Sequence, residues 1–327
     1  MRLAYCGKGG SGKSTICSLF ARYLAKNNYP VLVVDGDINQ HVGLAMGFSE
    51  EDITNVPKMG NDQDALRNYV YGNNQYIEGP DKIMESTPAG CGSGFLYLDE
   101  NNPVFDKYQI EKDGIRFMAV GGHDDESVGA TCFHKYTGMF GILLNHIIDG
   151  PDEYVLGDMC AGADPFASSG LATRFDAIVL VVEPTLKSVG VYDQCRKYGD
   201  PYGVKIYVIG NKIESEEDVQ FIKNRVGDDY LASFKKSDYV RNLEKGIFDD
   251  ISKLEPENTA ILEQLFGLSR TIPRDWDKYQ TVGQQMHKIA SESWGNVFME
   301  TDASEQIDPE FSYAELAEQR EQKKQAA

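Results

Sequence analysis

The sequence predicts an α/β fold, a doubly wound and mostly parallel sheet with helices on both faces. Short and largely apolar runs recur along the chain, and segments of helical length separate them, as expected when a covering helix follows each strand. The 327 residues are enough to bury a substantial core. We expect strands at residues 2–6, 31–34, 116–120, 154–156, 177–182 and 205–209.

A glycine-rich loop follows the first of these strands. Residues 7–15 read GKGGSGKST, which matches the phosphate-loop pattern G-x-x-x-x-G-K-[ST], and apolar residues at helical spacing come next. Glycines let backbone N–H groups curve around an anion, and the following helix presents its positive end. We therefore expect a nucleoside triphosphate site, with Lys13 on the β- and γ-phosphates and Ser14 on Mg²⁺. The other expected phosphate ligands are Gly9, Gly10, Ser11, Gly12 and Thr15.

A second lysine stands at the start of the motif. With Lys8 the loop reads K-G-G-x-G-K-S-T, which resembles the deviant phosphate-loop ATPases, a group with MinD, ParA, the nitrogenase iron protein and metal-insertion ATPases. The resemblance implies an ATP-dependent homodimer in which Lys8 reaches the nucleotide of the second subunit. A cation there would stabilise the charge that develops during phosphoryl transfer. The alternative is a solvated loop lysine.

Acidic residues end two further strands, at the edge where a parallel sheet presents side chains to a ligand. Asp35 and Asp37 follow the second strand, and Asp158 follows the strand at 154–156. The resemblance implies that Asp37 orients the attacking water and that Asp35 supports the Mg²⁺ shell. It also implies that Asp158 holds Mg²⁺ through a water and that the Gly162 backbone senses the γ-phosphate. The alternative for the first pair is a solvated turn.

Asn211 and Lys212 follow the strand at 205–209. In the deviant ATPases an asparagine at this place reads the edge of adenine. The resemblance therefore implies that both residues bind the nucleotide, and that the nucleotide is ATP rather than GTP.

A finer resemblance rests on segments read in chain order. They are 102–108, 114–122, 129–134, the helical run 140–148, and Glu183-Pro184-Thr185 with Ser188. These segments are similar to the nickel-insertion ATPases of carbon monoxide dehydrogenase maturation, the CooC family, and the similarity runs from residue 1 to about residue 265. It implies an ATPase that delivers nickel to a client metalloenzyme.

The metal-binding motif of that family is changed in this chain. In the family a glycine-rich loop carries C-x-C, and two subunits supply four thiolates to one metal. Here Cys132 stands at the first position and His134 at the second. Two chains would offer two cysteines and two histidines, a set that suits zinc and accepts nickel. The alternative is that both are ordinary interface residues.

Two other functions stay open. An ATP-gated electron donor resembling the nitrogenase iron protein would bridge an iron–sulfur cluster with Cys132 and Cys160 of each chain. However, Cys160 lies two residues after Asp158, where that family has three, and Ala161 takes the expected place. The other is a nucleotide-switched scaffold or partition protein, which would use ATP to dimerise and bind a partner.

Charge limits the partners of this chain. It has 32 lysines and arginines against 51 aspartates and glutamates, a net charge of -19. We therefore expect no broad basic face for nucleic acid and no attraction to anionic membranes. The sequence has no visible leader or membrane-length apolar run, and its six scattered cysteines form no disulfide framework, so we expect a cytoplasmic protein.

Two segments depart from the regular alternation. Residues 49–114 are polar and rich in proline and glycine, so we expect an insertion that is partly helical and surface-exposed. Beyond residue 214 the chain turns helical and charged. We expect an ATPase domain over 1–299 and a charged tail over 300–327, the tail being one loosely held helix too poor in apolar residues to target a membrane.

Overall fold

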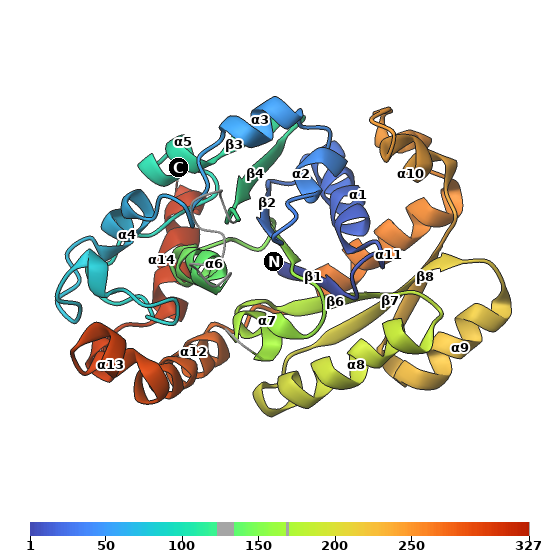
Figure 1. Ribbon diagram of the computed structural model, residues 1–327. Coiled ribbons are helices and arrows are strands. Elements are labelled where there is room, and N and C mark those ends of the chain that lie inside the picture. Colours follow the sequence, from blue (N-terminus) through green and yellow to red (C-terminus); the bar gives the residue numbers. More distant parts are fainter. Residues whose placement is uncertain (123–133, 168–169, 327) are drawn as a thin grey trace.

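The computed structural model describes residues 1–122, 134–167 and 170–326. It contains an eight-stranded sheet in the order β3-β4-β2-β5-β1-β6-β7-β8 (Figure 1). All neighbouring strands are parallel except β3 and β4, so the predicted fold class is confirmed. The strands are β1 Arg2–Gly7, β2 Val31–Gly36, β3 Ile110–Lys112, β4 Ile115–Ala119, β5 Tyr154–Met159, β6 Ala177–Val182, β7 Ile206–Ile213 and β8 Tyr230–Lys235.

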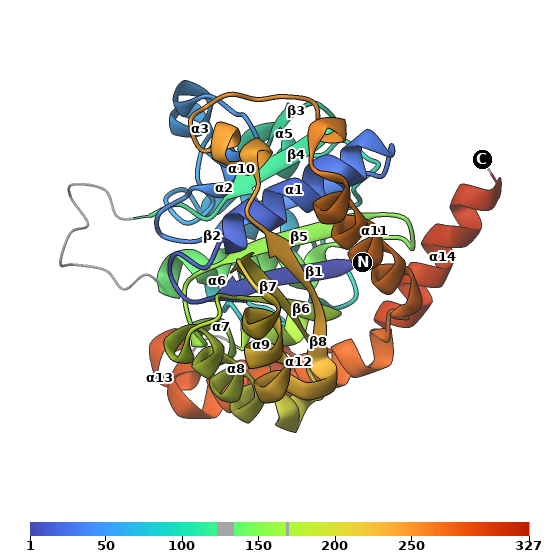
Figure 2. The ribbon, with the colours of Figure 1, turned by 90° about the vertical axis from the view of Figure 1, so that its right-hand side faces the viewer.

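Helices cover both faces of this sheet (Figures 1 and 2). Successive residues of β1 point to opposite faces: Leu3 and Tyr5 lie in the core beneath α1 and α11, and Ala4 and Cys6 lie in the core beneath α6 and α8. The helices are α1 Lys13–Lys26, α2 Val42–Ala45, α3 Glu50–Asn55, α4 Asp64–Tyr71, α5 Pro103–Tyr108, α6 His134–His146, α7 Asp164–Ala167, α8 Leu186–Gly199, α9 Glu216–Val226, α10 Asp238–Leu243, α11 Pro256–Thr271, α12 Trp276–Ala290, α13 Asn296–Met299 and α14 Tyr313–Ala326.

The edge strand β8 was not predicted, because the region after residue 214 was expected to be helical. In β8 only Ala232 and Phe234 are buried, and their neighbours are half exposed. A strand at the edge of a sheet with one covered face alternates apolar and polar residues, so it lacks the continuous apolar run of the central strands.

The segment 49–114 is partly helical, as expected, but it is not simply a surface excursion. It contributes α3, α4, α5 and β3. Leu66, Ile83 and Leu96 are fully buried and extend the core on the α6 side of the sheet. The apolar residues of this segment are spread among polar ones and prolines, so no periodic pattern disclosed their burial.

The C-terminal segment is packed rather than loosely held. Phe311 and Tyr313 are buried against Trp276, whose ring lies 5.8 Å from that of Tyr313. Further along α14, the Arg320 guanidinium pairs with Glu153 at 2.7 Å. A few aromatic side chains and one buried ion pair therefore dock a helix whose composition is otherwise that of a solvated one.

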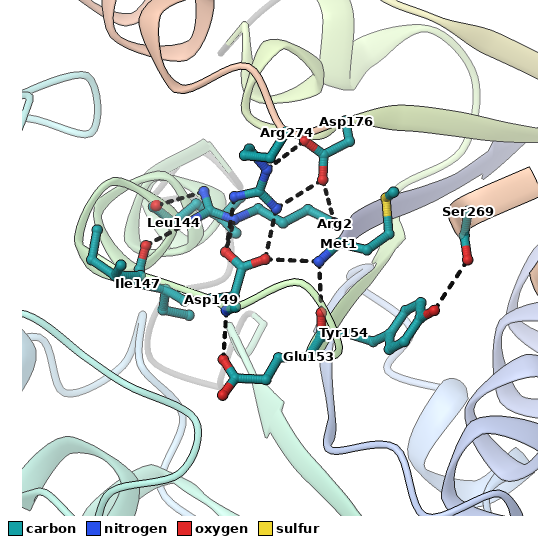
Figure 3. A network of polar contacts seen from close by, with 12 residues as sticks. Met1, Arg2, Leu144, Ile147, Asp149, Glu153, Tyr154, Asp176, Ser269 and Arg274 are labelled. Atoms are coloured by element: carbon teal, nitrogen blue, oxygen red, sulfur yellow. Dashed lines mark hydrogen bonds and ion pairs between the residues drawn. The ribbon is translucent and has the colours of Figure 1, made fainter. Parts of the chain in front are cut away.

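A buried polar network anchors the start of β1, at the end of the sheet opposite the glycine-rich loop (Figure 3). Asp149 accepts hydrogen bonds from the Met1 amino group at 2.9 Å and from Nε of Arg2 at 2.8 Å. Arg274 bridges Asp149 and Asp176. Burial alone would raise the pKa of Asp149, but Arg274 and Arg2 hold that pKa well below its usual range.

Among the described residues, no helix is long and apolar enough to cross a membrane.

Candidate nucleotide site

The glycine-rich loop joins β1 to α1 and turns through two left-handed residues. Gly10 has a φ of +82° and Gly12 a φ of +96°, which favour glycine at both positions. A Cβ at Gly12 would lie 2.1 Å from the side-chain amide nitrogen of Asn211, so a larger residue there would displace that side chain. Gly9 and Gly10 are exposed, and an anion can approach their backbone.

Lys13 stands at the centre of the site. Its ammonium donates a hydrogen bond to Asp37 and lies 3.8 Å from Oδ1 of Asp158. Burial opposes the charge of this lysine, but Asp158 and Asp37 raise its pKa, so the ammonium stays protonated. The ends of β2 and β5 thus hold a cation beside the glycine-rich loop.

The environment of Asp158 favours the binding of a cation by its carboxylate. Its Oδ2 accepts a 2.6 Å hydrogen bond from the Ser14 hydroxyl, while its Oδ1 is a buried oxygen without a hydrogen-bond partner in the described part of the chain. Burial raises the pKa of Asp158 to about 6, although Lys13 and Ser14 oppose the shift. A hydroxyl and an unsatisfied carboxylate oxygen fit Mg²⁺, which prefers oxygen ligands and retains several waters.

Asp35 is fully buried, next to Asp158 in the sheet. It lies opposite Asp158 in the register of β2 and β5. Its carboxylate accepts hydrogen bonds from the backbone N–H groups of Asp37 at 3.1 Å and of Val42 at 3.3 Å. Burial and the neighbouring Asp158 raise the pKa of Asp35 well above its usual range. Asp35 therefore orients the turn that carries Asp37.

Gly162 follows β5 and lies against the start of the glycine-rich loop. Its N–H donates a 2.9 Å hydrogen bond to the carbonyl of Gly7, and its φ is +84°. Nearby, the Cys160 thiol donates to Asp164 at 3.4 Å, and burial together with Asp164 raises the pKa of Cys160 to about 12.

Asn211 and Lys212 contact the glycine-rich loop from β7. The Asn211 amide donates to the carbonyl of Ser11 at 2.7 Å, and the Lys212 ammonium donates to the carbonyl of Gly10 at 2.7 Å. Lys212 also pairs with Glu183 at 2.6 Å. The two side chains, 200 residues from the loop, therefore brace its backbone.

A cavity of about 1370 Å³ opens beside these groups. Most predicted ligands line it, whereas Lys8, Ser11, Asp35, Asp158 and Gly162 lie outside its lining. The lining that sequence reasoning missed comes from α2 with the turn after it, and from the end of β8 with the segment that follows: Leu44, Phe48, Phe234, Lys235, Lys236, Ser237, Val240, Arg241 and Phe248. Recognition of β8 as a strand would have pointed to the second group, because ligands gather at the carboxyl ends of parallel strands.

Lys8, Cys132 and His134 are the remaining predicted residues. Lys8 is half-buried at the start of the loop, where its backbone carbonyl accepts the N–H of Ser11 at 3.0 Å. Cys132 lies outside the described residues. His134 begins α6, but its side chain is not among those described.

Known proteins share this architecture. The chain is 27% identical over 239 residues to an uncharacterized ATP-binding protein of Methanocaldococcus jannaschii, with 71% of this chain and 86% of that protein covered. It is also 27% identical over 226 residues to the carbon monoxide dehydrogenase accessory protein CooC of Rhodospirillum rubrum, with 69% and 79% covered.

Among solved structures, a ParA family ATPase from Chlorobium tepidum TLS matches with a TM-score of 0.55 and 15% identity, with 82% of this chain and 98% of that chain covered. This likeness concerns the fold alone. The model of the CobQ/CobB/MinD/ParA nucleotide binding domain matches residues 4–265. The match spans β1 to α11 and includes the glycine-rich loop, the acidic strand ends and Asn211. This chain therefore belongs to the CobQ/CobB/MinD/ParA nucleotide binding domain family.

Proposed function

We propose that this chain is a Mg²⁺-dependent ATPase that dimerises on binding ATP and acts as a maturation factor, delivering a metal to a client metalloenzyme. The observation that carries the ATPase proposal is the cluster of Lys13, Ser14, Asp37 and Asp158 at one end of the sheet. In this cluster Lys13 supplies a cation for phosphate, and Ser14 and Asp158 supply a hydroxyl and an unsatisfied carboxylate for Mg²⁺. Asp37 supplies a second carboxylate beside Lys13.

Each of these residues would have a separate role in ATP hydrolysis. Lys13 would leave Asp37 and bind the β- and γ-phosphates, because a triphosphate offers it more negative charge than one carboxylate. Asp37, once released, would orient the water that attacks the γ-phosphorus as the bond to the bridging oxygen breaks, giving ADP and phosphate. Ser14 and Asp158 would hold Mg²⁺, which neutralises charge on the phosphates when bound.

Dimerisation is proposed through Lys8. This lysine is half-buried beside the exposed Gly9 and Gly10, on the side of the loop where a second subunit could approach. In such a dimer the Lys8 ammonium would reach the partner's nucleotide and stabilise charge in the transition state. The Gly162 N–H would report the γ-phosphate by leaving the Gly7 carbonyl.

The proposal of metal delivery rests on the similarity to the CooC accessory protein together with Cys132 and His134. The cargo would be nickel, with zinc as the other metal that this ligand set suits. An iron–sulfur reductase is the weaker candidate, since Cys160 lies two residues after Asp158, where the nitrogenase iron protein family has three. A nucleotide-switched scaffold would share the ATP site but bind no transition metal.

The test is anaerobic purification followed by elemental analysis and an absorption spectrum. The wild type and Cys132→Ala are compared, each with ADP and with a non-hydrolysable ATP analogue. About one nickel or zinc per dimer, absent from the variant, supports metal delivery. About four irons per dimer with a brown colour would support the reductase. A protein that hydrolyses ATP but binds no metal after reconstitution would support the scaffold.

A further inference from the structure

The two most exposed large apolar side chains of the described residues are neighbours on α13, far from the nucleotide site. Val297 is 85% exposed and Phe298 is 73% exposed, and Ile289 and Trp294 lie within the same ten residues. These four residues are called the α12–α13 patch below. In Figure 1, α12 and α13 lie at the lower left and α1 and α10 at the upper right, so the patch is separate from the nucleotide cavity. Monomeric proteins rarely leave such a cluster uncovered.

The patch stands on a continuous helical stretch with a distinct shape. A π-helical turn, Ser291–Gly295, joins α12 to α13. The buried residues of this stretch recur at every fourth position: Gly283, His287, Ser291, Gly295 and Met299. In a regular helix a four-residue step drifts by about 40° around the axis, so a buried row of this length would turn away from the core. The wider π turn takes up part of that drift and keeps the opposite face, including Val297, directed outward.

Two parallel rows flank the outward face. One row is apolar, where Trp294 and Phe298 form an edge-to-face pair with ring centroids 6.0 Å apart. The other row is polar, with Lys288 near its start, and Glu300 follows this row as the residue that ends α13, with a φ of +56°. The midpoint between Lys288 and Glu300 in the sequence is Trp294.

This arrangement is complementary to itself. When two copies of a helix pair in antiparallel fashion about a two-fold axis near Trp294, each row meets the same row of the other copy in reverse order. Lys288 of one copy then faces Glu300 of the other, twice in the interface. Phe298 of one copy faces Ala290 of the other, where a small side chain leaves room for the ring.

We propose that the α12–α13 patch is a self-association surface, through which a second copy of this chain packs antiparallel and without nucleotide. The contact is small, so the dimer is expected to be weak, with a dissociation constant of about micromolar order. The net charge of -19 opposes association at long range, but salt near physiological strength screens it beyond about 8 Å. This surface is independent of Lys8, so the two contacts together would build assemblies larger than a dimer when ATP is present.

The test is sedimentation velocity on the nucleotide-free full chain over an about hundredfold range of concentration. The wild type is expected to shift from monomer to dimer, and Val297→Glu with Phe298→Glu is expected to stay monomeric. Both side chains are exposed, so the double variant should fold, which circular dichroism checks. The matched control is Ile247→Glu, at an exposed apolar residue in the loop after α10, which should dimerise as the wild type does.

A charge exchange tests the antiparallel register. Lys288→Glu should raise the dissociation constant about tenfold, because each attractive pair becomes repulsive and each occurs twice. Adding Glu300→Lys to the same chain should restore the wild-type constant. A wild type that stays monomeric throughout, a double variant that dimerises normally, or a charge exchange without rescue would overturn the proposal. The nucleotide-free measurement leaves the ATPase proposal untouched whichever result is found.

Discussion

The Ser14 hydroxyl donates a 2.6 Å hydrogen bond to Asp158, whose other carboxylate oxygen is buried without a hydrogen-bond partner among the described residues. The first turn of α1 and the end of β5 therefore meet around a carboxylate that is half satisfied. Such an oxygen costs free energy in the nucleotide-free protein and is available to a cation.

Lys13→Ala should abolish ATP binding, with the dissociation constant raised about a hundredfold or more. The substitution removes a buried cation that would make charge-assisted hydrogen bonds to two phosphates. Isothermal titration with ATP and Mg²⁺ measures the loss, and a phosphate-release assay follows turnover. Lys26→Ala is the matched control, since Lys26 lies on the same helix in an exposed pair with Asp250. Wild-type turnover in Lys13→Ala would rule out the nucleotide assignment.

Lys8→Ala should leave nucleotide binding by the monomer intact and reduce the dimer formed with ATP. Its ammonium is proposed to act only on the nucleotide of the other subunit, so the loss should appear in assembly and turnover rather than in affinity. Light scattering with a non-hydrolysable ATP analogue measures the dimer. The experiment is made in the Val297→Glu, Phe298→Glu background, so that the proposed second contact does not obscure it. An unchanged dimer yield contradicts a role for Lys8 across the interface.

Asp158→Asn should stabilise the nucleotide-free protein at neutral pH while removing the dependence of ATP binding on Mg²⁺. The pKa of Asp158 is about 6 in the folded state, above its ordinary value of 3.8. The folded state therefore binds the proton more tightly, and stability falls as pH rises from about 4 to 6, at a cost of about 3 kcal/mol above that window. Urea unfolding at pH 7.5, a value chosen well above about 6, measures the gain. An unchanged or lower stability would show that the ionised form is not penalised.

Asp149→Asn should act in the opposite direction and destabilise the protein by about 3 to 5 kcal/mol. Arg2, Arg274 and the Met1 amino group all lose the carboxylate that compensates their burial (Figure 3). The same urea titration measures the loss. Because Asp158 and Asp149 are both buried aspartates, the pair of variants separates the effect of charge environment from that of burial. Equal effects on both would contradict this account of the network.

Two buried histidines should make stability fall as the solution is acidified. Burial lowers the pKa of both His146 and His287 from 6.5 to about 4. Their neutral forms are favoured in the folded state, so their stabilisation is complete above about pH 6.5 and is lost as pH falls toward 4, by about 3 kcal/mol each. His146→Phe should flatten the pH dependence of urea unfolding in this window. His41→Phe, at an exposed position, is the control and should leave the slope unchanged.

The sequence by itself determined the frame of the molecule and the chemistry of its loop. The six predicted strands all fall on strands of the sheet, because strands buried on both faces carry continuous apolar runs that few other structures tolerate. The order of strand, glycine-rich loop and helix was equally plain, since a chain that encloses phosphate needs glycine at the turns and lysine beside them. The location of the acidic strand ends at one edge of a parallel sheet followed from the strand pattern, whereas their individual roles came from the resemblance to the deviant ATPases and stay predictions.

Only the tertiary structure decided how these parts meet. The contact of Asn211 with the Ser11 carbonyl and the opposition of Asp35 to Asp158 join residues more than a hundred positions apart. No local pattern encodes such pairs, because strand order sets them. The edge strand β8 and the docked α14 were hidden for a related reason. Their burial depends on the neighbour that covers one face, so β8 has only two buried residues and α14 keeps a largely polar composition. The periodicity of a sequence indicates how much of a helix or strand is buried. Only the packed chain shows which other helices and strands bury it.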